Sequence, residues 1–337
     1  MLEIRDLSVR IGPYEIVSIE ELDLAPGERL GIVGESGSGK TMTAMSIVGL
    51  QPRDAIVTGS IKFNGKELVG LSDQRLAAIR GADIGVVFQD PLRALNPTMR
   101  VGRQVAEALR LHLDMSRSER KARVLELLEQ VQLPDAKSFV RRYPHQLSGG
   151  QQQRVMIAMA IACGPQLLIA DEPTTALDVT VQKGILELLV SLSRDNDMGV
   201  LFVSHNLGVI KAVSEVVGVI YGGHLVESGP TGTVIERSHH RYTDALIAAN
   251  PGHSLGDDGI EARIGQRLDI IKGAVPPLGG FPSGCKFRGR CEFEIDKCAE
   301  DPPITRGDDD HRFKCWNPAE AGSSHAVTDQ GVTDGAR

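Results

Sequence analysis

A glycine-rich run near the N-terminus has the residue types needed to hold the phosphates of a nucleotide. It extends from Gly34 to Thr41, between an apolar strand-like segment, 29–33, and a stretch of helical periodicity, 41–50. Glycines let successive backbone N–H groups surround phosphate oxygens, and the following helix adds its positive dipole end. The closing lysine reaches the β- and γ-phosphates, and the following hydroxyl coordinates Mg²⁺. The predicted ATP-binding residues of this loop are Gly34, Ser36, Gly37, Ser38, Gly39, Lys40 and Thr41.

Two adjacent carboxylates follow another apolar run. Asp171 and Glu172 come directly after residues 167–170, which have the length of a buried strand. In phosphoryl transfer, such carboxylates hold the metal ion and activate the attacking water. We therefore expect Asp171 to lie beside Mg²⁺ and Glu172 to act as the general base. An acidic pair that only caps a helix is the alternative, and the phosphate loop upstream favours the catalytic interpretation.

A second glycine-containing run, Leu147-Ser148-Gly149-Gly150-Gln151, precedes a helix-like stretch, 152–163. The start of that helix is a second anion-binding site in one chain. One ATP cannot easily contact both sites, although an ordinary glycine-rich helix start would also fit this run. With this pentapeptide, residues 1–250 resemble the ABC ATPase family. The resemblance implies a head-to-tail dimer, in which the γ-phosphate held by one subunit is bound by Ser148, Gly149, Gly150 and Gln151 of the other.

Three further positions match motifs of that family, in the family's order. The resemblance implies that Gln89 touches Mg²⁺ and the attacking water and senses the membrane partner. It implies that Asp178 communicates across the dimer and that His205 contacts the γ-phosphate. The predicted catalytic residues are Lys40, Gln89, Glu172 and His205, and those predicted to bind Mg²⁺ are Thr41, Gln89 and Asp171.

Two positions depart from the family pattern. An aromatic side chain that stacks on adenine is expected near Ile11, and Tyr14 is the nearby candidate for that contact. Asn206 replaces the acidic residue that usually follows the histidine. Neither change removes a group that does chemistry.

Three other segments resemble one branch of the family. Residues 88–102 and 241–246 are similar to the oligopeptide and dipeptide importers, and the cysteine-containing segment, 285–318, resembles the characteristic C-terminal extension of that branch. This resemblance implies a second ATPase subunit in a heterodimer, two integral permease subunits and an external solute-binding protein, at the cytoplasmic face of the cell membrane. Peptide is the usual solute of the branch, while other members carry nickel, glutathione, opines or oligosaccharides.

Four cysteines gather late in the chain, separated by five, six and sixteen residues: Cys285, Cys291, Cys298 and Cys315. Disulfides are disfavoured because an ATP-binding chain without a signal peptide works in a reducing compartment. Structural zinc usually takes cysteine pairs two to four residues apart, whereas iron–sulfur clusters accept four cysteines at varied spacing. Relatives in the branch resemble [4Fe–4S] proteins here. We expect a [4Fe–4S] cluster, with zinc as the alternative and unliganded thiols as a third.

Composition excludes several other classes. The 337 residues carry a formal net charge of −7, which argues against a nucleic-acid partner and against a soluble ABC ATPase that acts on DNA or ribosomes. No signal peptide is visible, and no run approaches the roughly 20 apolar residues of a spanning helix. Any role at a membrane must then come through partner subunits.

The predicted elements assemble into an α/β fold. Strands are expected at 2–10, 29–33, 84–88, 167–170 and 200–203, and helices at 41–50, 152–163 and 181–194. We predict a P-loop ABC ATPase core with a parallel sheet, N-terminal antiparallel strands, a helical insertion and a small Cys-rich C-terminal module. The predicted boundaries are 1–250 for the nucleotide-binding domain, 95–162 for its helical subdomain, 251–318 for the linker and Cys-rich module, and 319–337 for a disordered tail.

Overall fold

The computed structural model describes residues 1–175, 177–249 and 270–319. Its centre is a group of parallel strands: β3 (Arg29–Val33), β6 (Ile84–Val87), β7 (Leu167–Asp171), β8 (Gly199–Ser204) and β9 (Val216–Tyr221). They lie in the order β9-β3-β8-β7-β6. Every residue of β7 and β8 is buried, as expected for parallel strands with both faces covered. The predicted parallel core is confirmed.

The N-terminal strands form the antiparallel part of the same sheet. They are β1 (Leu2–Ile11), β2 (Tyr14–Leu24), β4 (Ala55–Phe63) and β5 (Lys66–Glu67). β1 pairs antiparallel with both β2 and β4. A further strand, β10 (His224–Pro230), joins the two parts, because it pairs antiparallel with β9 and touches β2 at a single position, His224 against Ser18. The predicted N-terminal antiparallel strands are also confirmed.

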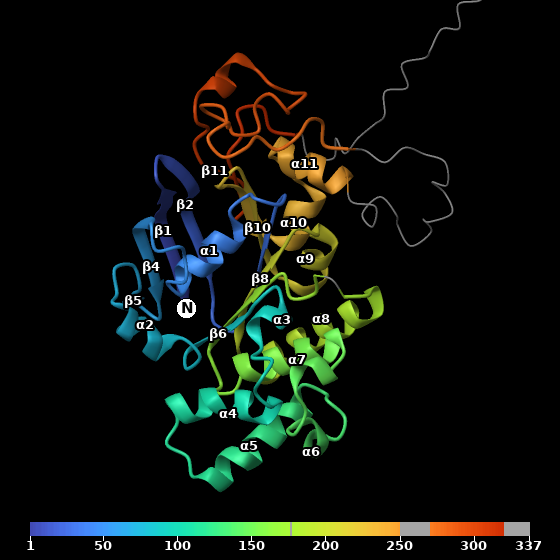
Figure 1. The fold of residues 1–337 in the computed structure, drawn as a ribbon. Helices are drawn as coiled ribbons and strands as arrows, with labels where there is room; N and C mark the ends of the chain where they lie inside the picture. Colours follow the sequence, from blue (N-terminus) through green and yellow to red (C-terminus); the bar gives the residue numbers. More distant parts are fainter. Residues whose placement is uncertain (176, 250–269, 320–337) are drawn as a thin grey trace, which may run out of the picture.

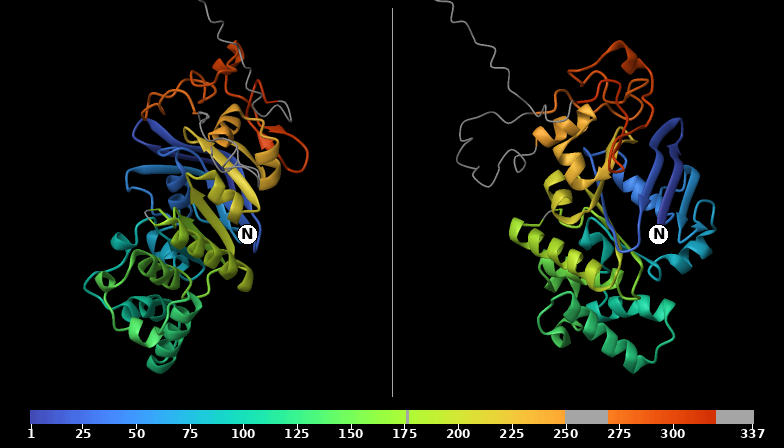
Figure 2. Two further views of the ribbon diagram at one scale, coloured as in Figure 1. Left: turned by 90° about the vertical axis from the view of Figure 1, so that its right-hand side faces the viewer. Right: turned by 180° about the vertical axis from the view of Figure 1, so that it is seen from behind.

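Helices cover the sheet and form the insertion at one end of the molecule. The helices before and within the insertion are α1 (Lys40–Ile47), α2 (Asp73–Ile79), α3 (Pro91–Ala94), α4 (Val101–His112), α5 (Arg117–Gln130) and α6 (Ala136–Phe139), with a 3-10 turn at Pro144–Gln146. Those after it are α7 (Gly149–Ala160), α8 (Val179–Asp195), α9 (Leu207–Val213), α10 (Thr231–Glu236) and α11 (Arg241–Ala248). Figures 1 and 2 show α4, α5 and α6 together at the end of the molecule farthest from the last described residues. α5 begins with a capping box between Ser116 and Glu119. Within the described ranges, no helix combines the length and the apolar character needed to span a bilayer.

The C-terminal segment, residues 270–319, contains little regular structure but joins the sheet. Its elements are a 3-10 turn at Asp296–Ala299 and the two-residue strands β11 (Thr305–Arg306) and β12 (Arg312–Phe313). β12 pairs antiparallel with β10, with Phe313 opposite Glu227. Ala319, the first residue of the predicted tail, is buried and its N–H donates to the carbonyl of His239. The rest of that tail and most of the predicted linker lie outside the described residues.

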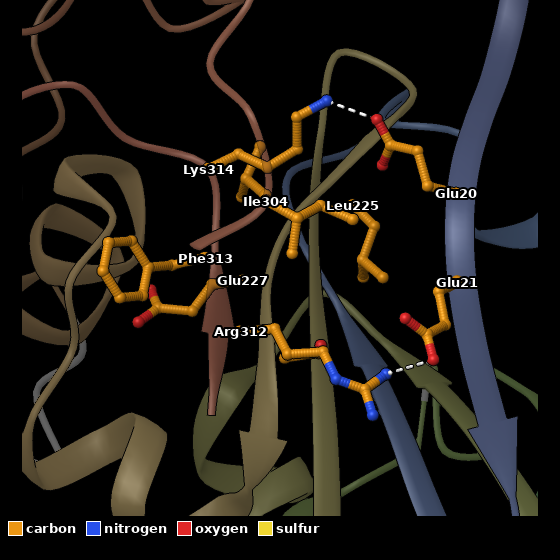
Figure 3. Close-up of a pocket in the computed structure, with 10 residues that line it drawn as sticks. Glu20, Glu21, Leu225, Glu227, Ile304, Arg312, Phe313 and Lys314 are labelled. Atoms are coloured by element: carbon orange, nitrogen blue, oxygen red, sulfur yellow. Dashed lines mark hydrogen bonds and ion pairs between the residues drawn. The ribbon is translucent and has the colours of Figure 1, made fainter. Parts of the chain in front are cut away.

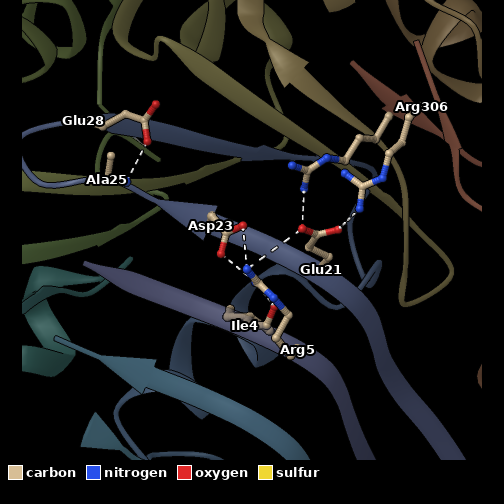
Figure 4. Close-up of polar contacts among 8 residues, drawn as sticks. Ile4, Arg5, Glu21, Asp23, Ala25, Glu28 and Arg306 are labelled. Atoms are coloured by element: carbon tan, nitrogen blue, oxygen red, sulfur yellow. Dashed lines mark hydrogen bonds and ion pairs between the residues drawn. The ribbon is translucent and has the colours of Figure 1, made fainter. Parts of the chain in front are cut away.

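Ion pairs join the C-terminal segment to strand β2. Glu21 accepts from Arg306 at 2.6 Å and lies 3.2 Å from Arg312 (Figure 4). Glu20 accepts from Lys314 at 2.5 Å, and both residues line a small cavity together with Leu225 and Ile304 (Figure 3). Each pair at a partly exposed site contributes little by itself, but together they fix the segment against β2.

A buried carboxylate lies where the C-terminal segment meets β10. Glu227 is 1% exposed, and its two oxygens accept from the backbone N–H groups of His239 at 2.6 Å and His240 at 3.1 Å. Nε2 of His311 lies 2.8 Å from Oε1 of Glu227. A buried charge is tolerated only when its hydrogen-bonding capacity is used in this way. Glu227 therefore ties β10, the start of α11 and the C-terminal segment together.

We expect the substitution Glu227→Gln to lower the free energy of unfolding by about 2–3 kcal/mol. The amide NH₂ of glutamine would face a backbone N–H donor and leave it unsatisfied. Urea denaturation of the full chain measures the change. The matched control is Glu236→Gln, at an exposed position of α10, and equal stability of the two variants would contradict this role of Glu227.

Candidate active site

The predicted phosphate loop lies between β3 and α1, and its backbone geometry requires glycine. A Cβ atom at Gly34 would lie 2.1 Å from the carbonyl oxygen of Ile220. Gly39, the N-cap of α1, has φ of 98°, and no side chain caps the helix. The first N–H groups of α1 thus have no side-chain acceptor, and a helix start of this kind is suited to bind an anion.

Lys40 is the buried cation of the loop. Its side chain is 4% exposed, and Nζ donates to the carbonyl oxygens of Gly34 and Glu35, both at 2.9 Å. Burial lowers the pKa of Lys40, and the nearby carboxylates of Glu172, Asp171 and Glu35 oppose that shift. Lys40 is therefore held at the loop with a charge that phosphate oxygens would stabilise.

Thr41 and Asp171 meet where α1 begins and β7 ends. Oγ1 of Thr41 donates to Oδ1 of Asp171 at 3.0 Å. Burial raises the pKa of Asp171, although the hydrogen bond from Thr41 lowers it. A hydroxyl and a carboxylate are oxygen ligands of the kind that Mg²⁺ takes alongside substrate phosphates. A divalent cation here would offset the cost of burying the Asp171 charge, so the donor set fits this metal.

Glu172 is the centre of a hydrogen-bonded group at the end of β7. Oε2 accepts from Nε2 of Gln89 and from Oγ1 of Thr175, both at 2.9 Å. Oε1 lies 3.1 Å from Nδ1 of His205. Burial alone would raise the pKa of Glu172, but the hydrogen bonds from His205 and Thr175 hold it below its ordinary value. The carboxylate is thus ionised at neutral pH and can polarise a water molecule.

Lys40, Thr41 and Glu172 line one open pocket of about 470 Å³, whereas Asp171 lines a groove that shares Thr41 and Gln89 with it. The apolar side chains in its lining are Ile16 and Met42, which the sequence did not single out. Tyr14 is not in the lining, and its ring lies against Gly279, where a Cβ would be 2.4 Å from the tyrosine Cε1. The predicted residues that line the pocket are Ser36, Gly37, Ser38, Gly39, Lys40, Thr41, Gln89, Glu172 and His205.

The second glycine run lies apart from this pocket. Ser148 is the N-cap of α7 and forms a capping box with Gln151. Gly149 instead lines a groove of about 830 Å³, together with Gln89 and Leu92 among others. Ser148, Gly150, Gln151 and Asp178 do not appear in the pocket lining. The start of α7 therefore does not line the pocket that holds Lys40, although the groove beside Gly149 also includes Thr41 and Asp171.

Two predicted or unusual residues have local capping roles. Oδ1 of Asp178 accepts from the N–H of Val181 at 3.0 Å and caps α8. Asn206 caps α9, because its Oδ1 accepts from the N–H of Gly208 at 2.9 Å. An amide oxygen serves as well as a carboxylate at a helix N-cap. This explains in local terms how asparagine is accommodated after His205.

The four late cysteines are partly or fully buried and form no disulfide. Burial raises the pKa of Cys285, and the charges of Cys315 and Cys298 raise it further. Burial, followed by the same neighbours and Cys285, raises the pKa of Cys291 to about 11. The thiols thus lie close enough to affect one another. Across 1–175, 177–249 and 270–319, however, no three His, Cys, Asp or Glu side chains are placed to hold a metal ion.

Comparison with known proteins agrees with this geometry. The model of the ABC transporter family matches residues 18–175, and that of the oligopeptide/dipeptide transporter C-terminal region matches residues 226–298. A putative peptide import ATP-binding protein of Brucella ovis is 44% identical over 327 residues, covering 94% of this chain and 96% of that protein. This chain belongs to the ABC transporter family. The ABC subunit is an ATPase, and its C-terminal region places it in the oligopeptide/dipeptide branch.

Other relatives and solved structures support the same assignment. A second putative peptide import ATP-binding protein, from Brucella abortus, is 45% identical over 89% of the ABC subunit and 91% of its own length. A solved ATP-binding cassette, in a dimeric post-hydrolysis state bound to ADP and Pi, aligns with a TM-score of 0.62 and 30% identity. It covers 68% of the ABC subunit and 99% of its own chain. The protein cbiO1 of Clostridium perfringens aligns with a TM-score of 0.60 at 25% identity, over 69% of the subunit and 89% of its own chain.

We expect Glu172→Gln to bind ATP but to hydrolyse it at least about 100-fold more slowly than the unaltered ABC subunit. Glutamine keeps the shape of the side chain but cannot take a proton from water. Phosphate release measures kcat, and a fluorescent ATP analogue measures the Kd. Near-normal turnover would rule out Glu172 as the base. Glu187→Gln, at an exposed position of α8, is the matched control.

Proposed function

We propose that this ABC ATPase powers the import of dipeptides or oligopeptides. The observation that carries the proposal is the pairing of a complete ATPase core with a C-terminal segment of the oligopeptide/dipeptide type, at 44% identity to proteins described as putative peptide importers. This subunit does not touch the solute itself. Its contribution is the free energy of ATP hydrolysis, delivered to membrane partners.

The proposed chemistry is in-line attack of water on the γ-phosphate. Lys40 and the N–H groups of the loop bind the β- and γ-phosphates, while Thr41, Asp171 and Gln89 hold Mg²⁺. Glu172 accepts the proton of the attacking water, and His205 contacts the γ-phosphate. Support comes from the hydrogen bonds that already gather Gln89 and His205 on Glu172. Catalysis is then mainly positioning and charge neutralisation. Ile16 and Met42 are proposed as apolar contacts of the nucleotide. Tyr14, which lies in β2 with Ile16, is the nearby aromatic residue.

The proposed assembly is a head-to-tail dimer of two ATPase subunits, with a related but different chain as partner. The support is that Ser148 and the two glycines after it do not line the ATP pocket of their own subunit, which leaves them available to a nucleotide on the other subunit. Asp178 is proposed to transmit across that dimer. The exposed side chain of Leu92, at 67%, borders the groove beside Gln89. We propose that a segment of a permease subunit enters this groove. The proposed assembly contains two permease subunits, an external solute-binding protein and the two ATPase subunits, which lie at the cytoplasmic face of the membrane.

Reconstitution of the full assembly in proteoliposomes tests this function. We expect ATP hydrolysis to rise, and labelled peptide to accumulate, only when the solute-binding protein and a short peptide are both present. Stimulation by nickel, glutathione, an opine or an oligosaccharide in place of peptide would overturn the peptide assignment. Co-purification with nucleic acid or ribosomes, without a permease, would overturn the transport role. A preparation with Lys40→Ala controls for background hydrolysis.

We further propose that Cys285, Cys291, Cys298 and Cys315 hold a [4Fe–4S] cluster, with zinc as the alternative. The support is the donor set, since four thiols are the number such a cluster needs, and the charges of Cys298 and Cys315 raise the pKa of both Cys285 and Cys291. The described side chains do not form a finished metal site. Binding would therefore have to draw the thiols together and deprotonate them.

Purification without oxygen, followed by iron, sulfide and zinc analysis, tests the cluster. We expect a brown protein with about four irons and four sulfides per chain. One zinc per chain in a colourless protein would replace the cluster with a structural metal site. Absence of both would leave free thiols. The control is Cys163→Ser, which should leave the iron, sulfide and zinc contents unchanged because Cys163 lies outside the C-terminal segment.

A further inference from the structure

The C-terminal segment reaches the ATP-binding loop through one side chain. Nη1 of Arg290 donates to Oε2 of Glu35 at 2.7 Å, and Nη2 donates to Oε1 at 3.1 Å. Glu35 is the second residue of the phosphate loop, and 255 positions separate it from Arg290. The arginine side chain is only 8% exposed. This two-point geometry is the strongest form of an arginine–carboxylate pair.

Glu35 is held on its backbone as well as on its side chain. Its N–H donates to the hydroxyl of Tyr242 at 2.8 Å, and its carbonyl accepts from Nζ of Lys40 at 2.9 Å. One residue thus connects α11, the phosphate-binding lysine and the C-terminal segment. The carbonyl that Lys40 contacts and the carboxylate that Arg290 contacts therefore belong to the same residue.

Arg290 is also held in place by contacts other than its pair with Glu35. Its Nε donates to the carbonyl of Lys272 at 2.9 Å, and Nη1 also donates to the hydroxyl of Tyr221 at 3.0 Å. Tyr221 is 1% exposed, and its ring packs edge-on against Phe287 with centroids 5.2 Å apart. The guanidinium is therefore held rigidly by the C-terminal segment and by β9. A lysine has no planar fork with which to repeat these contacts.

The charge of Glu35 makes its partner important. A carboxylate in a loop that binds a triphosphate would repel the ligand and attract Lys40, and Glu35 is one of the groups that act on the charge of Lys40. Arg290 supplies the opposite charge at hydrogen-bonding distance. With Glu35 neutralised, the charge of Lys40 remains available to the phosphates.

We propose that Arg290 is a positioning residue for ATP binding. By neutralising and orienting Glu35, it keeps the phosphate loop and Lys40 in the geometry that receives the β- and γ-phosphates. The affinity for ATP then depends on how the C-terminal segment is seated. Arg290 does not line the ATP pocket, so its effect falls on KM and Kd rather than on kcat.

The test uses the full chain with Arg290→Ala and, as matched control, Arg288→Ala. Arg288 lies in the same segment and pairs with Glu294 at 2.9 Å, away from the loop. We expect Arg290→Ala to raise the KM for ATP, and the Kd of a fluorescent ATP analogue, by about tenfold. We expect kcat to change less than KM. Arg290→Lys should recover only part of the affinity for ATP, and Arg288→Ala should have the same KM and Kd as the unaltered protein.

A double variant separates positioning from a general loss of structure. In a Glu35→Gln background the carboxylate charge is absent, so adding Arg290→Ala should raise the Kd by clearly less than it does in the unaltered protein. An equal rise in both backgrounds would overturn the proposal, as would an unchanged Kd in Arg290→Ala. A lowered Tm with an unchanged KM would show that Arg290 only stabilises the fold. Should Arg290→Ala fail to fold, the same comparison with Arg290→Lys decides the matter.

Discussion

A loop that binds a triphosphate through backbone N–H groups must be held in shape by the rest of the molecule. Such a loop has no regular hydrogen-bonding pattern of its own, and its glycines make it flexible in isolation. Here β3 and α1 fix its two ends, and the close approach of Ile220 to Gly34 leaves no room for any other side chain. The parallel core places the end of β7 near the start of α1, so Glu172 reaches the pocket and Asp171 reaches Thr41 from a different part of the chain. Most of the active site follows from this arrangement.

Charge balance in the site depends on burial as much as on pairing. Lys40 and Asp171 are both buried. Burial lowers the pKa of Lys40 and raises the pKa of Asp171, so it favours the neutral form of each. Phosphate and a divalent cation supply the opposite charges that make the ionised forms favourable. Glu172 differs, because its hydrogen-bond donors keep it ionised without a ligand. The site thus separates groups that bind ligands from the group suited to act on water.

The sequence predicted those parts of the fold that depend on residues close together in the chain. The phosphate loop and the carboxylates at the end of β7 are local patterns, and the parallel and antiparallel parts of the sheet followed from strand patterns. Boundaries were less secure, since α1 ends at Ile47 rather than near residue 50, where Gly49 adopts φ of 64°. Contacts between distant segments left no local trace. Arg290 with Glu35, and Glu227 with His311, have no spacing rule that could have paired them, and Ile16 gave no sign that it would line the pocket.

The position of β12 has a consequence for how the protein is made. β2 and β10 touch at one position only, and β12 occupies the adjoining stretch of β10 beside Glu227. During synthesis the ribosome releases β11 and β12, residues 305–306 and 312–313, long after β10 and the strands that precede it. Until Arg290 emerges, Glu35 has no arginine beside it, and until residues 312–313 emerge, this side of β10 stays open. The nascent ATPase core therefore reaches its final form only when nearly all of the described chain has emerged, which delays full nucleotide affinity until the C-terminal segment is present.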